Sequence, residues 1–150
     1  MTLLRRQISS DIQDLNRLHQ EYWWIPDETM IRPSVEVLEA KCVLAAKLIE
    51  DGVTFKDFIL NTYFTGPWIS SWAFHKSLFP YRLQAGAEHF VLWNSMHDYN
   101  WDIHDVIVSE RIEAMLKVQL GHNRFDFAWY KNPKPSIPEL WHVQVFWVVL

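Results

Sequence analysis

The sequence has few of the residues that build stapled or metal-rich folds. Its 150 residues contain one cysteine, Cys42, and only four glycines. One cysteine excludes an internal disulfide and any zinc site built from several thiolates, and it indicates a reducing compartment. The chain also lacks a glycine-rich phosphate loop, a Gly-x-Ser-x-Gly elbow and a His-Glu-x-x-His motif. We therefore expect a cytoplasmic protein that uses no metal and no cofactor.

Long apolar runs and clustered positive charge are missing too. No run approaches the roughly 18 apolar residues of a membrane span, and Met1 to Arg6 are not followed by a signal-peptide core. Lysine and arginine are scattered in a chain of net charge −4, which does not fit a nucleic-acid binder. We expect no membrane and no nucleic-acid partner, and a small molecule as the ligand.

Large aromatic side chains are abundant. The chain has 9 Trp, 9 Phe and 5 Tyr, and this surplus indicates either a heavily packed core or an apolar pocket. The length fits one domain over residues 1–150.

Periodicity and capping residues predict an α+β fold, in which a small antiparallel sheet is flanked by helices. A helical part over about 9–64 should contain helices near 12–22, 34–51 and 55–64, and a sheet-containing part should cover about 79–150. That second part should hold strands near 88–93, 124–130 and 140–149, with a helix near 106–120. The segment 69–78 shows no clear period and is predicted as a loop or short helical turn that could cover a pocket. In the second helix, the predicted inward stripe is Val35, Leu38, Cys42, Ala45 and Ile49.

The last strand carries the clearest chemical signal. Side chains two apart share a face, so Leu140, His142, Gln144 and Phe146 point one way and the alternating Trp and Val residues point the other. A histidine near its ordinary pKa can exchange protons at neutral pH. The simpler alternative is a buried strand whose histidine and glutamine only hydrogen-bond to neighbours. His75 is predicted to be a surface residue.

Several short blocks occur in the order of a known family. They are Pro80-Tyr81-Arg82, then Gly86 with His89-Phe-Val-Leu-Trp93, then Trp129-Tyr-Lys-Asn132, and finally Ser136-Ile-Pro-Glu-Leu-Trp-His142-Val-Gln144-Val. Together they resemble the fungal N-acetylglucosamine-induced protein family, a domain of largely unknown function, over about residues 55–150. The resemblance implies a fungal protein.

A more distant similarity is to the histidine-triad and galactose-1-phosphate uridylyltransferase superfamily. His89 and His97 stand eight residues apart, and Asn132, Ser136, His142 and Gln144 follow in the order of its motif. This similarity implies a histidine-triad-like fold, often dimeric, with His142 at the nucleophile position and Gln144 at the glutamine of the transferase branch. Two departures stand out: Leu140 replaces the first histidine, and prolines at 133, 135 and 138 replace phosphate-binding glycines and remove backbone donors.

Three functions fit these observations. The first is a cofactor-independent cyclase, isomerase, dehydratase or lactone hydrolase of secondary metabolism, acting on a polyketide- or terpenoid-like molecule with His142 as general acid or base. The second is a histidine-triad-like nucleotide or sugar-nucleotide hydrolase or transferase. The third is a non-catalytic binding protein. The predicted catalytic residues are His142, Gln144 and His89, and the predicted substrate-binding residues are Arg82, Tyr81, Trp93, Asn132, Trp129, Trp68 and Trp72. Aromatic strand edges make a homodimer reasonable.

Overall fold

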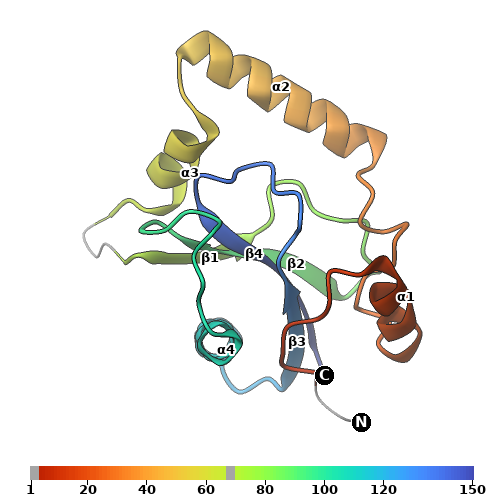
Figure 1. The fold of residues 1–150 in the computed structure, drawn as a ribbon. Coiled ribbons are helices and arrows are strands. Elements are labelled where there is room, and N and C mark those ends of the chain that lie inside the picture. Colours follow the sequence, from red (N-terminus) through yellow and green to blue (C-terminus); the bar gives the residue numbers. More distant parts are fainter. Residues whose placement is uncertain (1–3, 67–69) are drawn as a thin grey trace.

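The computed structural model describes residues 4–66 and 70–150. Three helices come first along the chain, and a sheet interrupted by one further helix follows (Figure 1). The elements are α1 (Ile12–Glu21), α2 (Val35–Asp51), α3 (Phe55–Tyr63), β1 (Trp72–Lys76), β2 (Ala87–Asn94), α4 (Asp105–Leu120), β3 (Phe125–Tyr130) and β4 (Trp141–Val149). The predicted α+β class, a small antiparallel sheet flanked by helices, is confirmed.

Helix ends follow the capping residues of the sequence. The Ser34 hydroxyl accepts the backbone N–H of Val37, and α2 ends at Gly52, whose φ of 68° lies in the left-handed region that glycine adopts without strain. The Thr54 hydroxyl starts α3 in the same way by accepting the N–H of Asp57. These local signals fix where each helix begins and ends.

The sheet has the strand order β1-β2-β4-β3, and neighbouring strands in this order pair antiparallel. In the β2–β4 ladder, Trp93 lies opposite His142 and Val91 lies opposite Gln144. Residues opposite each other share a face, so the polar side chains of β4 meet those of β2 on one side of the sheet. The predicted alternation along β4 is thereby confirmed.

The other side of the sheet forms the main core against α4. Burial of these large apolar side chains supplies the main driving force for folding. Its fully buried members include Leu92, Ile112, Leu116, Phe127, Val143 and Val145.

The His142 side of the sheet is covered by two smaller cores instead of one. Near β3, Leu15 of α1 packs with Tyr130 and Phe146. Near β1, Ile59 of α3 packs with Trp93. Helix α2 extends above the sheet between these two covers (Figure 1).

One strand was not expected. Residues 72–76 form β1, an edge strand paired with β2, where the sequence predicted a loop or helical turn. Trp72 and Phe74 alternate with Ala73 and His75, which is a strand pattern, but five residues are too few for a period to stand out. Within the described ranges the sheet therefore has four strands, and it begins before residue 79.

The predicted inward stripe of α2 is wrong at its two ends. Val35 is 66% exposed and Ile49 is 82% exposed, whereas Leu48 is the buried residue of the helix. The reason is that α2 does not lie on the apolar core. It covers a cavity, which Leu38, Cys42 and Ala45 line.

Candidate functional site

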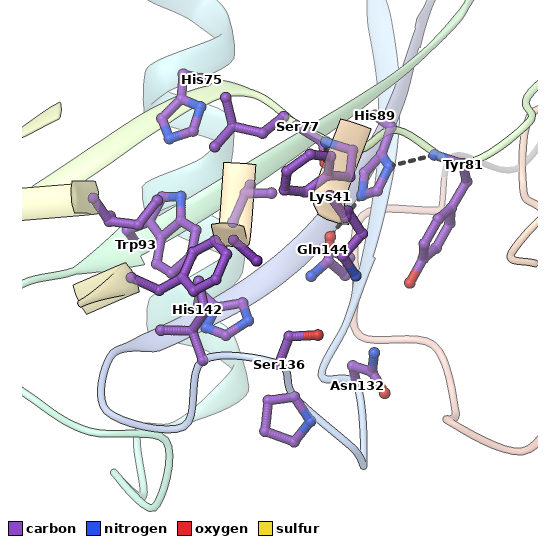
Figure 2. A pocket seen from close by; sticks show the side chains of 18 of the residues that line it. Lys41, His75, Ser77, Tyr81, His89, Trp93, Asn132, Ser136, His142 and Gln144 are labelled. Atoms are coloured by element: carbon purple, nitrogen blue, oxygen red, sulfur yellow. Dashed lines mark hydrogen bonds between the residues drawn. The ribbon is translucent and has the colours of Figure 1, made fainter. Parts of the chain in front are cut away.

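A cavity of about 450 Å³ lies between α2 and the His142 side of the sheet. Its floor is formed by β2 and β4, its upper wall by α2, and one side by the loop around residues 132–137 (Figure 2). The walls are mainly apolar, with Ile59, Val91, Trp93 and Ile137 among them. A concave, mostly apolar space with few polar groups is the usual form of a small-molecule site.

His142 lies in the floor of this cavity with 5% of its surface exposed. Its Nδ1 is 2.9 Å from the carbonyl oxygen of Leu140. A carbonyl can only accept, so Nδ1 carries the proton and Nε2 has a free lone pair. No described residue donates to that Nε2. The ring is flanked by Trp93, at 4.4 Å between ring centroids, and by Tyr99, at 5.0 Å.

His89 fixes the orientation of Gln144. The backbone N–H of Tyr81 donates to His89 Nδ1 over 3.0 Å, so the proton of this ring is on Nε2. Nε2 donates in turn to Gln144 Oε1 over 2.6 Å. The amide oxygen of Gln144 is thus occupied, while its NH₂ group has no partner within the described part of the chain. Figure 2 shows His89 and Gln144 together at one side of the cavity.

Burial keeps both imidazoles uncharged. It lowers the pKa of His89 to about 4, although the hydrogen bond to Gln144 acts in the opposite direction. Burial likewise lowers the pKa of His142 to about 4, opposed by the Leu140 hydrogen bond and assisted by the positive charge of Lys131. At neutral pH the ring of His142 is therefore in its neutral form, in which Nε2 can accept a proton.

The structure gathers six of the predicted site residues around the cavity. His142, Gln144, His89, Tyr81, Trp93 and Asn132 all line it. Asn132 has a structural task as well, because its side-chain oxygen accepts the backbone N–H of Lys134 and its carbonyl accepts the Tyr99 hydroxyl. The Tyr81 hydroxyl pairs with that of Tyr130 over 2.6 Å.

Three other predicted substrate-binding residues lie elsewhere. Trp129 and Trp72 belong to the core on the α4 side of the sheet, where the Trp129 indole N–H donates to Ser109. The Arg82 guanidinium donates to the backbone carbonyls of Thr29 and Arg32 and so holds the segment before α2 in place. Trp68 lies outside the described residues.

Lys41 and His75 also line the cavity, although neither is a site residue that the sequence predicts. His75 was expected at the surface, but it stacks on Tyr63 with 3.3 Å between ring centroids, and burial lowers its pKa. The alternation of residues 72–76 is the signal for its place on β1, but it covers too few residues to predict a strand. Lys41 comes from α2, and the available signal is its position three residues after Leu38 and four before Ala45, which places it on their face of the helix.

Residues 4–66 and 70–150 contain neither a metal-binding cluster nor a membrane-spanning helix. No group of three or more His, Cys, Asp or Glu side chains there could hold a metal ion. None of the helices there is both long and apolar enough to cross a membrane.

Comparisons with known proteins give a fold neighbour. No family model matches the chain, and no curated protein matches it. A solved structure described as "Crystal Structure of HTC1" is similar with a TM-score of 0.50 and 15% sequence identity, over 93% of this chain and 83% of that chain. At this identity the likeness concerns the fold alone.

Proposed function

We propose that the protein is a cofactor-independent enzyme in which His142 is a general acid/base for a small, largely apolar carbonyl compound. One observation carries this proposal. His142 Nε2 and the Gln144 NH₂ group have no hydrogen-bond partner among residues 4–66 and 70–150, and the two residues lie two apart on one strand, at the floor of an apolar cavity.

That spacing suits proton abstraction next to a carbonyl. Alternate residues of a strand are roughly 6.6–6.8 Å apart along its axis, about the span of a carbonyl group, its neighbouring carbon and two hydrogen-bonding contacts. The substrate oxygen accepts an N–H of Gln144. His142 Nε2 takes a proton from the adjacent carbon, the C–H electron pair forms the enolate, and the imidazolium returns the proton to the substrate. Isomerisation, dehydration and aldol-type cyclisation share this step, and a lactone would instead use His142 to activate water.

The electrostatics of the site favour the enolate. Hydrogen-bond donors that are already oriented stabilise charge that develops on an oxygen, and His89 orients the Gln144 amide for this purpose. In the free protein burial opposes the imidazolium. A nearby enolate supplies the negative charge that favours the imidazolium, so the basicity of His142 rises as the reaction proceeds.

The two alternative functions make different demands. Nucleotidyl transfer needs several phosphate-binding groups. The described lining of the cavity contains one cationic side chain, Lys41, and the loop around residues 132–137 at its side is rich in proline, which lacks a backbone N–H donor. A thermal-shift screen with nucleotides tests it, because a nucleotide enzyme is stabilised by them. A pure binding protein needs no base at His142. The resemblance to the fungal N-acetylglucosamine-induced family motivates a role in secondary metabolism, and the free thiol of Cys42 is consistent with the cytoplasm.

The test is deuterium incorporation into 2-tetralone, an apolar ketone with acidic carbon-bound protons, followed by proton NMR in D₂O. His142→Asn keeps a donor for the Leu140 carbonyl and removes Nε2. We expect it to lower the exchange rate by about 10²-fold or more, the typical contribution of a positioned acid-base group. His122→Asn alters an exposed histidine and is the matched control. Equal exchange in wild type and His142→Asn contradicts the acid-base role, and binding without exchange in the wild type supports the binding-protein alternative.

A further inference from the structure

Lys41 is the one charged side chain in the lining of the cavity as described, apart from the neutral histidines, and no Asp or Glu accompanies it. Its Nζ lies over the ring of Phe79, 5.6 Å from the centroid. Among residues 4–66 and 70–150, no carboxylate lies within ion-pair distance of this ammonium group. The cavity therefore carries a positive charge without a counter-charge of its own.

Such a charge is informative because of its surroundings. An ammonium group beside apolar walls is less well hydrated than one in open water. Its attraction to an anion in the cavity is therefore stronger than the attraction between the same two charges at a fully exposed position. The chain as a whole has net charge −4, so the attraction for an anion is local to this cavity. Figure 2 shows Lys41 reaching from α2 toward the side of the cavity that holds Gln144 and His89.

We propose that the cavity selects an apolar molecule with a single carboxylate, which pairs with Lys41 while the apolar body lies against Val91, Trp93 and Ile137. Lys41 is a specificity-determining residue in this account. The proposal rests on the proposed function, since it names the substrate class of the same cavity. The alternative is that the aliphatic part of Lys41 only packs on Phe79, while its ammonium group stays in solvent and binds no ligand.

The experiment compares two probes of similar shape, the anion 2-naphthoate and the neutral ketone 2-acetylnaphthalene, by amide-shift NMR titration. The wild type is expected to bind 2-naphthoate about tenfold more tightly, the effect of one charge-assisted hydrogen bond. Lys41→Met should remove this preference without weakening the ketone, and Lys41→Arg should retain it. Lys47→Met makes the same charge change on an exposed position of α2 and should change neither affinity.

A cavity-filling variant locates the binding. Ala45→Trp, in the α2 wall, should weaken both probes. Equal affinities of the two probes for the wild type, or an unchanged 2-naphthoate affinity in Lys41→Met, overturn the substrate class. These results are separable from the 2-tetralone assay. If His142→Asn loses exchange but Lys41→Met binds 2-naphthoate like the wild type, only the proposed carboxylate of the substrate is refuted. If Lys41→Met loses the preference for 2-naphthoate but exchange does not depend on His142, only the acid-base function is refuted.

Discussion

Acidification should destabilise the protein through its two buried histidines. The pKa of His142 and that of His89 are each lowered from 6.5 to about 4, with burial as the largest cause. Between these values the unfolded chain binds more protons than the folded protein. Stability is therefore complete above about pH 6.5 and falls as the pH drops toward 4.

The magnitude follows from linkage. Moving from about pH 7.5 to about pH 5.0 costs about 2 kcal/mol for each of these histidines, or about 4 kcal/mol for both. That is a large share of the 5–15 kcal/mol typical of a domain. Both side chains are almost fully buried, so solvent screening does little to reduce the effect. Asp126 and His75 titrate as well, but their contributions cancel when a variant is compared with the wild type.

Urea unfolding at the two pH values measures the effect. The unfolding free energy of the wild type should fall between the two pH values, and in His142→Asn this fall should be smaller by about 2 kcal/mol. The comparison holds whatever the stability of the variant at neutral pH. His122→Asn, at an exposed position, should keep the wild-type difference. If His142→Asn shows the same pH dependence as the wild type, burial does not hold His142 neutral.

Three further variants probe separate parts of the structure. Gln144→Leu removes the amide donors and should lower 2-tetralone exchange by roughly 10²- to 10³-fold, the typical cost of a lost oxyanion-hole donor; an unchanged rate would exclude Gln144 as the oxyanion donor. Tyr81→Phe leaves the buried Tyr130 hydroxyl without its partner and should cost about 1–3 kcal/mol in urea unfolding, and a cost near zero would show that the pair is not formed. Trp129→Phe breaks the bond to Ser109 on the opposite side of the sheet, so it should lower stability by about 1 kcal/mol and leave 2-naphthoate affinity intact.

Local chemistry accounts for the part of the structure that was predictable. Capping residues such as Ser34 and Thr54 satisfy the first free N–H groups of a helix, so they mark helix starts in the sequence itself. Alternation in β4 similarly placed His142 and Gln144 on one face before any partner strand was known.

The residues whose positions were predicted wrongly, or not at all, are those whose positions depend on strand order and on how the helices cross the sheet. Trp129 is opposite Val145 in the β3–β4 ladder, so it shares the α4 face, and nothing in β3 alone reveals that register. Lys41 lies about a hundred positions before His142 in the sequence. It reaches the same cavity because α2 crosses above the sheet, an arrangement that no local pattern encodes. The histidine-triad likeness and the homodimer stay predictions.

The central claim is that His142 presents an unprotonated Nε2 to the cavity. Nitrogen-15 NMR of the imidazole at neutral pH tests it directly, because protonated and unprotonated ring nitrogens have distinct shifts. The account predicts a neutral ring with its proton on Nδ1, bonded to the Leu140 carbonyl, and a change in the Nε2 shift when 2-tetralone binds. A proton on Nε2, or an imidazolium at neutral pH, would contradict it, since no lone pair would then be available to accept a substrate proton.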